Sequence, residues 1–126
     1  MKYLFTMIAV AVLFVSCGSK GPKVILPKEG QTTISMRVGD TLRLTGNSHP
    51  STGLSSIISF SATGFSMQQE KVYDNKEAME AHAMGADKAT ITYTLVALEP
   101  GEYEVVNSEK FRGTMKNEAK YTVTIK

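Results

Sequence analysis

The stretch from Ala89 to Ala97 constrains the fold more than any other part of this sequence. It reads Ala-Thr-Ile-Thr-Tyr-Thr-Leu-Val-Ala, with apolar side chains at every second position. Successive side chains of a β-strand point to opposite faces of a sheet, so this alternation predicts a strand with one face in a hydrophobic core. An amphipathic helix would instead repeat its apolar residues every three or four positions.

The same alternation recurs along the chain between short turn signals. Gly39-Asp40, Gly64, Glu99-Pro100-Gly101 and Gly113 mark the turns. The predicted strands cover Ile34 to Val38, Leu42 to Leu44, Ile58 to Ala62, Phe65 to Tyr73, Ala89 to Ala97, Tyr103 to Val105 and Tyr121 to Ile125. About seven short strands separated by such turns predict an all-β protein, an immunoglobulin-like β-sandwich.

One segment between two predicted strands departs from this pattern. Residues 76–84 are rich in helix formers and predict a short helix. Asn75 is placed to cap its start, and Gly85 to end it in a left-handed conformation. Two interpretations of Met79 and Met84 stay open, since they either cover a sheet edge or form exposed contacts.

The first residues have the features of an export signal. Met1-Lys2 gives a positive start, Tyr3 to Val15 is almost wholly apolar, and Ser16-Cys17-Gly18 follows. The apolar run is shorter than the roughly 20 residues of a membrane span. Small residues before a lone cysteine resemble a bacterial lipobox. Residues 1–16 are therefore predicted to be a lipoprotein signal peptide, with lipid attached to Cys17; the alternative is an ordinary signal peptide.

Residues 17–30 are predicted to form the lipidated N-terminus and a linker, and residues 31–126 a single domain. The first acidic residue after Cys17 is Glu29, so no acidic export signal follows the lipid site. We therefore expect a bacterial cell-envelope protein on the outer membrane, with its domain facing the periplasm. The membrane is expected to be contacted through the N-terminal lipid only.

Charge and cysteine content exclude several classes of function. The formal net charge is +2, and loss of Lys2 with the signal peptide would lower it by one. The lysines are dispersed, so no nucleic-acid partner is predicted. Cys17 is the only cysteine, which rules out an intrachain disulfide and a cysteine-based metal site.

An alternating strand leads directly into a compact loop at residues 46–54. The loop reads Gly-Asn-Ser-His-Pro-Ser-Thr-Gly-Leu. Pro50 fixes one φ angle, and Gly53 permits a turn that residues with a Cβ resist. Such a loop stays exposed and keeps one shape, which suits insertion into a partner's cleft.

This loop resembles the first inhibitory loop of chagasin-type inhibitors of papain-like cysteine peptidases. That family has an Asn-Pro-Thr-Thr-Gly-aromatic signature after a Gly-[Asp/Glu]-x-Leu strand. Pro50, Ser51, Thr52 and Gly53 match its core, whereas Leu54 stands in place of the aromatic residue and His49 in place of Asn. The second and third loops match weakly, through Gly85 and Phe111.

The resemblance implies a reversible inhibitor whose three loops occlude a peptidase active-site cleft. The loops would be residues 47–54, 74–87 and 107–119, at one end of the sandwich. The backbone of Ser51 to Gly53 would cross the catalytic centre, offering amides and hydroxyls. The implied peptidase-binding residues are Pro50, Ser51, Thr52, Gly53, Leu54, Gly85 and Phe111. A monomer without cofactor or metal is expected.

Other interpretations of these residues stay open. The hydroxyls of Ser51 and Thr52 would satisfy only turn backbone groups, and Phe111 would be a lid over the sandwich. His49 is interpreted as a loop residue rather than a catalytic base. No nucleophile, base and orienting group can be placed, so no enzyme is predicted, and His49 with His82 lacks a third zinc ligand.

The alternative function is a non-enzymatic envelope lipoprotein with an immunoglobulin-like domain for glycan binding or scaffolding. Glycan sites usually expose planar aromatic side chains, and this chain has no tryptophan. That absence counts modestly against glycan binding.

Overall fold

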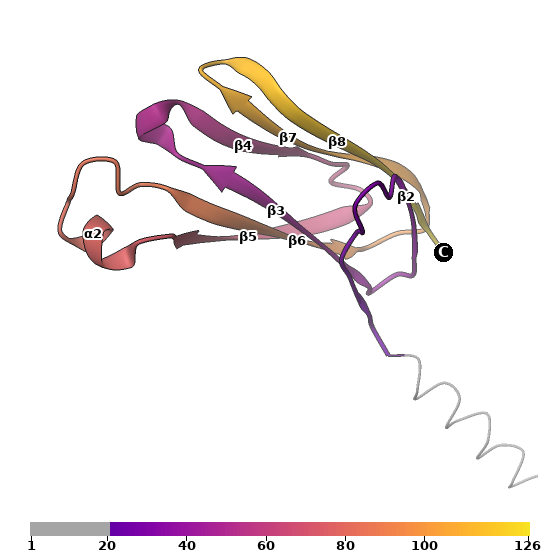
Figure 1. Ribbon diagram of the computed structural model, residues 1–126. Helices are drawn as coiled ribbons and strands as arrows, with labels where there is room; N and C mark the ends of the chain where they lie inside the picture. Colours follow the sequence, from indigo (N-terminus) through magenta and orange to yellow (C-terminus); the bar gives the residue numbers. More distant parts are fainter. Residues whose placement is uncertain (1–20) are drawn as a thin grey trace, which may run out of the picture.

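The computed structural model describes residues 21–126, which form two β-sheets packed face to face (Figure 1). One sheet has the order β1 (Val24–Ile25), β3 (Thr41–Ser48), β6 (Ala89–Ala97), β5 (Phe65–Tyr73). The other has the order β2 (Thr33–Met36), β8 (Thr114–Ile125), β7 (Gly101–Phe111), β4 (Leu54–Ser59). This arrangement confirms the predicted all-β, immunoglobulin-like sandwich.

The first two strands join different sheets. β1 pairs in parallel with β3, and β2 pairs in parallel with β8, while the other strand pairs are antiparallel. β1 lies inside the segment predicted as linker. The carboxylate of Asp40 accepts hydrogen bonds from the backbone amides of Lys23 and Arg37, both at 3.0 Å. These bonds tie the start of β1 to the turn before β3.

The hydrophobic core fills the space between the sheets at the end where the described chain begins. Its central side chains come from the predicted alternation on β3, β6, β7 and β8. The buried apolar residues include Ile34, Met36, Leu42, Leu44, Phe65, Ile91, Tyr93, Leu95, Val105, Val123 and Ile125. Burying this apolar surface is the main stabilising contribution available to a chain without a disulfide.

The core becomes polar towards the other end of the sandwich. On β7 the inward positions after Val105 are Asn107 and Glu109. Asn107 Nδ2 donates to the carbonyl of Thr45 at 2.9 Å, and the backbone amide of Asn47 donates to Glu109 Oε1 at 3.1 Å. These side chains therefore bond backbone groups of β3 that have no neighbouring strand there, which blunts an open sheet edge.

The prediction of a long loop at residues 107–119 is wrong. β7 continues to Phe111 and β8 starts at Thr114, so only Arg112 and Gly113 connect them. Their φ angles of 52° and 81° are both positive, as in the two-residue turn that suits a twisted hairpin. The sequence looked like a loop because the hairpin extends beyond the apolar core and its inward positions are polar.

Three predicted boundaries also change. The strand predicted at Ile58 to Ala62 is β4, which begins at Leu54 and ends at Ser59. The first predicted strand ends at Met36, before a turn that exposes Val38. The first loop is correspondingly shorter than residues 47–54, because β3 continues to Ser48.

The helix α2 is shorter than predicted and covers Lys76–Glu80. Asn75 caps it as predicted, because its Oδ1 accepts from the amide of Ala78 at 3.0 Å. Gly85 does not end the helix: the C-cap is Ala81, and His82 with φ 55° makes the turn. Met84 is fully exposed, which favours the open interpretation of a contact residue over that of a covering one.

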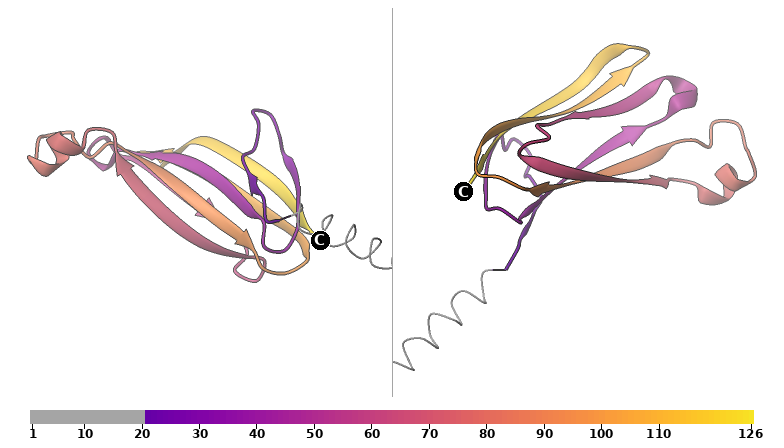
Figure 2. Two further views of the ribbon diagram at one scale, coloured as in Figure 1. Left: turned by 90° about the horizontal axis from the view of Figure 1, so that it is seen from below. Right: turned by 180° about the vertical axis from the view of Figure 1, so that it is seen from behind.

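The described chain begins and ends at the same side of the sandwich. The C-terminus and the start of β1 lie opposite the end that carries α2 and the β7–β8 turn (Figures 1 and 2). No helix within residues 21–126 has the length and apolar character needed to cross a bilayer. The predicted signal peptide and Cys17 lie outside the described residues.

Candidate protein-binding site

Three connecting segments meet at the end of the sandwich opposite the chain start. We call His49–Gly53 loop one, residues 74–88 loop two, and Arg112–Gly113 loop three. Loop one joins β3 to β4, loop two joins β5 to β6 and includes α2, and loop three joins β7 to β8. Figure 2 shows all three at the same end in both views.

Loop one is a single tight turn closed by the strands on either side. Pro50–Thr52 form a short 3-10 helix with proline at its first position. Gly53 ends it with φ 89°, a left-handed conformation that favours glycine. His49 and Leu54 then pair across the base of the turn, with N–O distances of 2.9 and 3.2 Å.

Every backbone N–H of this segment donates a hydrogen bond. The amides of Thr52 and Gly53 bond the carbonyls of His49 and Pro50, both at 3.0 Å, and the amide of Ser51 bonds Asp87. The hydroxyl of Thr52 also donates to the carbonyl of His49, at 2.9 Å. The expectation that the backbone of Ser51 to Gly53 offers amides to a partner is therefore wrong, because these amides already bond carbonyls of the turn and the carboxylate of Asp87.

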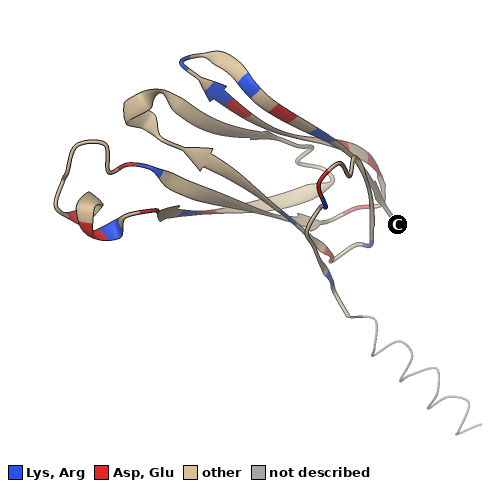
Figure 3. Cartoon of the chain, in the orientation of Figure 1, with Lys and Arg blue, Asp and Glu red and all other residues tan. Residues whose placement is uncertain are grey.

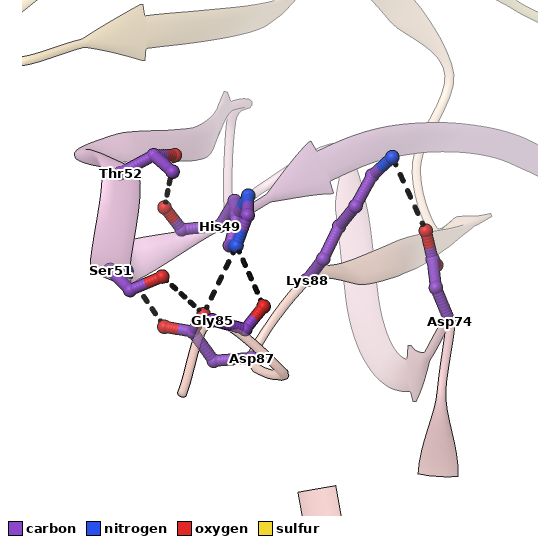
Figure 4. Close-up of polar contacts among 7 residues, drawn as sticks. All are labelled: His49, Ser51, Thr52, Asp74, Gly85, Asp87 and Lys88. Carbon is purple, nitrogen blue, oxygen red and sulfur yellow. Dashed lines mark hydrogen bonds and ion pairs between the residues drawn. The ribbon is translucent and has the colours of Figure 1, made fainter. Parts of the chain in front are cut away.

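Loop one is bonded to loop two through the carboxylate of Asp87 and the carbonyl of Gly85 (Figure 4). The backbone amide and the hydroxyl of Ser51 each donate to Asp87 at 2.7 Å. His49 Nε2 lies 3.1 Å from the carbonyl of Gly85 and 3.3 Å from Asp87 Oδ1. Because 36 residues separate Ser51 from Asp87, these bonds join distant parts of the chain.

The electrostatics of Asp87 follow from these contacts. The Ser51 hydroxyl is the main cause that holds the pKa of the Asp87 carboxyl below its ordinary value, although desolvation opposes the shift. The Ser51 amide and the nearby His49 lower the pKa further. Asp87 therefore remains an acceptor across the neutral pH range.

Serine, histidine and aspartate meet here, which the sequence did not predict, but their connections differ from those of a catalytic triad. In a triad the serine hydroxyl bonds the histidine, which in turn bonds the carboxylate. Here the hydroxyl of Ser51 donates to Asp87, and His49 Nε2 points at the same carboxylate. The histidine is thus not placed to take the serine proton. Within residues 21–126, no cluster of three histidine, cysteine or acidic side chains is arranged to hold a metal.

Loop one also contacts loop three. The backbone amide of Arg112 donates to the carbonyl of Gly53 at 2.8 Å, and Leu54 pairs with Phe111 across β4 and β7. A Cβ on Gly53 would lie 2.9 Å from Arg112 Cγ. Gly53 is therefore required both for its φ angle and for this close approach.

The end of the hairpin carries an exposed aromatic ring. Phe111 is 42% exposed, and the Arg112 guanidinium carbon lies 5.1 Å from its ring centroid. Phe111 is not among the described residues that pack on the core, so it does not act as the lid considered above. Its position beside Leu54 makes an apolar patch next to loop one.

Loop one, the part of β3 after Arg43 and all of β4 carry no Lys, Arg, Asp or Glu. No Lys, Arg, Asp or Glu occurs between Arg43 and Glu70. Figure 3 shows charged residues on the hairpin and on loop two, with an uncharged segment between them. A surface of this composition resembles the centre of a protein interface, where charged residues are depleted.

The structure brings the predicted loop residues to one end of the molecule. Pro50, Ser51 and Thr52 are exposed in the 3-10 helix, and Gly53 and Leu54 follow it. Gly85 lies against His49, and Phe111 against Leu54. Sequence reasoning missed Asp87 and Arg112. Only the pair Arg112-Gly113 gave a local signal, since a residue followed by glycine between strands often forms a hairpin turn.

Fold and site define an immunoglobulin-like sandwich with three bonded loops at one end. No protein-family model matches the chain, and no curated protein matches it in sequence. Solved structures match the chain in fold. The cysteine protease inhibitor EhICP2 from Entamoeba histolytica superposes with a TM-score of 0.62 at 18% identity, over 84% of this chain and 96% of the inhibitor.

Two further structures share the fold. Amebosin gives a TM-score of 0.53 at 18% identity, over 82% of this chain and 95% of that protein. PbICP-C, solved in complex with falcipain-2, gives 0.52 at 15% identity, over 82% of this chain and 99% of the other. These neighbours confirm, at the level of the fold, the resemblance to chagasin-type inhibitors.

Proposed function

We propose that this protein is a reversible inhibitor of papain-like cysteine peptidases and that its three loops fill the active-site cleft. The fold is shared with EhICP2, whose name gives it as a cysteine protease inhibitor, and with PbICP-C, which was solved with falcipain-2. The similarity supports the proposal, and the chemistry of the loop end gives it a mechanism.

The observation that carries the proposal is the fixed, uncharged loop one between two loops that are bonded to it. Its amides are satisfied by Asp87 and by loop carbonyls, so the turn keeps its shape before a partner arrives. A loop already in its bound shape loses little conformational entropy on docking. Without charged side chains, its burial avoids the large cost of desolvating ions.

Loop one would contact the peptidase through carbonyl oxygens and through the side chain of Thr52. Among the described residues, the carbonyls of Ser51 and Thr52 accept no hydrogen bond. They are therefore available to N–H groups that line a cleft, and an unmatched carbonyl would cost about 1–3 kcal/mol if buried without such a partner. The hydroxyl of Ser51 is already bonded to Asp87, so we assign it to loop positioning.

The apolar contribution would come from loop three. Phe111 is exposed enough to enter a subsite, and Leu54 beside it extends the apolar surface. Aromatic anchors of this kind dominate binding energies at protein interfaces. Gly85 would lie near the cleft, since His49 holds its carbonyl against loop one.

The same rigidity would make loop one resist cleavage by the bound peptidase. Peptide hydrolysis requires the scissile carbonyl within about 3–3.5 Å of the nucleophile and in the correct orientation. The 3-10 turn at Pro50–Thr52 is closed by the His49–Leu54 pair and by the Arg112 amide. Attack on this backbone would require several of those bonds to break together.

We also propose that Cys17 anchors the domain to a membrane by a lipid. The start of the described chain lies opposite the three loops (Figure 1), so such an anchor would direct the loops away from the bilayer. Changing Cys17→Ala should release the protein from the membrane fraction and abolish labelling by fatty acid. Retention of both would contradict the anchor and leave the inhibitor proposal standing.

Inhibition constants against a panel of papain-like peptidases test the proposed function. The parent should inhibit at least one member, and Thr52→Arg should weaken inhibition at least thirtyfold, or about 2 kcal/mol, because its charged side chain would project into the cleft. Thr52→Ser keeps the hydroxyl bond to His49 and should inhibit as the parent does. A parent that inhibits no member would favour the scaffold or glycan-binding alternative.

A further inference from the structure

Asp87 occupies an unusual position for an acidic side chain in a binding loop. Its carboxylate faces Ser51 and His49 of loop one, and its side chain is 25% exposed. Oδ2 accepts from the Ser51 amide, and Oδ1 accepts from the Ser51 hydroxyl and lies 3.3 Å from His49 Nε2 (Figure 4). Both oxygens are therefore used within the protein.

These contacts are the polar connection between loop one and loop two. Among the described residues, each recorded polar contact between these loops joins His49 or Ser51 to Gly85 or Asp87. Loop two otherwise extends from the sheet, held at its base by the amide of Asp74 bonded to the carbonyl of Lys88 at 2.9 Å. Without the carboxylate, only the His49–Gly85 contact would remain.

We propose that Asp87 is a positioning residue that locks loops one and two into a single rigid surface. It would set the strength of inhibition without touching the peptidase, and in this respect the inference rests on the proposed function. If the carboxylate is lost, the Ser51 amide loses its acceptor and the two loops move independently. Ordering them again on docking lowers the affinity, by about tenfold for an ordering cost of 1.4 kcal/mol.

The chain supplies a matched control in the same loop. Asp74 also carries one negative charge, but its partner is Lys88, with Nζ 3.7 Å from Oδ2, and this pair is remote from loop one in Figure 4. Asp74→Ala and Asp87→Ala thus remove the same charge from loop two. Only the second removes the connection to loop one. Asp87→Asn removes the charge but keeps one acceptor oxygen. It therefore distinguishes the effect of the hydrogen bond from the effect of the charge.

The test combines two measurements on the full-length protein and these three variants. Hydrogen exchange of the Ser51 amide, followed by NMR, reports the connection directly, and inhibition of papain reports its consequence. Asp87→Ala should speed exchange at Ser51 at least tenfold and weaken inhibition about tenfold. Asp87→Asn should recover part of both effects, and Asp74→Ala should change neither. Thermal melts check that each variant is folded.

The outcomes separate this inference from the function on which it rests. Unchanged exchange at Ser51 in folded Asp87→Ala would overturn the proposed lock. Faster exchange with parental inhibition would overturn the positioning role. If the parent fails to inhibit papain and every other papain-like peptidase tested, the proposed function fails and the positioning role falls with it, while the exchange rates still decide whether Asp87 locks the loops.

Discussion

The two ends of this sandwich are held together by different kinds of interaction. At the end where the described chain begins, β3 buries Leu42 and Leu44 against β6. Towards the loops the buried positions of β3 become Gly46 and Ser48, and β7 turns from Val105 to polar residues. One end is stabilised by apolar burial, whereas the other is shaped by hydrogen bonds.

At each end an aspartate carboxylate accepts hydrogen bonds that join separate segments of the chain. Asp40 binds the amides of Lys23 and Arg37 at the apolar end, and Asp87 binds the amide and hydroxyl of Ser51 at the loop end. Asp40 is buried and joins a strand to a turn, whereas Asp87 is partly exposed and joins two loops. The comparison predicts that the free energy of folding and the shape of the loop end depend on separate residues.

The largest expected effect is on stability, at the apolar end. Leu95 on β6 is completely buried, and Leu95→Ala should lower the free energy of unfolding by about 3 kcal/mol through lost burial and the cavity left behind. Val72→Ala, at an exposed position on the neighbouring β5, should change it by less than about 0.5 kcal/mol. Urea denaturation measures both. If both variants lowered the free energy of unfolding by the same amount, the apolar core would not be the main source of stability.

The next effect is on affinity, at the loop end. Phe111→Ala should weaken inhibition about thirtyfold, or about 2 kcal/mol, because it removes the apolar anchor beside Leu54. Met115→Ala removes a similarly exposed side chain from the same hairpin and serves as its control. Both variants should melt close to the parent. If Met115→Ala weakened inhibition as strongly, general hairpin damage rather than a specific anchor would be the cause.

A smaller effect distinguishes two glycines with positive φ. Gly53→Ala should destabilise the loop end by about 1–2 kcal/mol from the left-handed backbone alone, and more from the contact with Arg112. Gly85 has a similar φ of 76°, but a Cβ added there would meet no atom within 4 Å. Gly85→Ala should therefore destabilise the protein less than Gly53→Ala. Thermal melts and papain inhibition rank the two. The reverse order would contradict the close packing of loops one and three.

The smallest expected effect is a loss of stability at low pH. The folded pKa of Asp87 is lowered from 3.8, chiefly by the Ser51 hydroxyl, and that of Asp40 chiefly by the Lys23 amide. A depressed folded pKa contributes stability above the unfolded value, and this contribution disappears as pH falls through the folded pKa. The side-chain carboxyl chemical shifts of Asp87 and Asp40 should therefore titrate with midpoints below pH 3.8. Midpoints above pH 3.8 would contradict both carboxylate contacts.

The comparison of the two ends also explains what the sequence could predict. Alternation over Ala89–Ala97 and at Leu42 and Leu44 identified strands because their inward positions are apolar. The same rule failed for residues 107–119, where Asn107 and Glu109 point inward to bond β3. A polar side chain that replaces a neighbouring strand carries no periodic signal in one sequence.

The candidate site shows the same limit. The composition of Pro50 to Gly53 indicated a fixed turn, because proline and glycine restrict or permit particular φ angles. The role of Asp87 could not be predicted, since its partners His49 and Ser51 lie 38 and 36 residues earlier and no local pattern links them. Contacts between loops are set by the tertiary fold, which local propensity does not describe.

The kinetic pattern of papain inhibition tests the central claim, occlusion of the active-site cleft, most directly. Initial rates of peptide-substrate hydrolysis would be measured at several concentrations of the full-length protein. Occlusion predicts that the apparent KM rises while kcat stays constant, and that the effect is lost in Thr52→Arg. A fall in kcat at constant KM, or hydrolysis that the protein leaves unchanged, would contradict it.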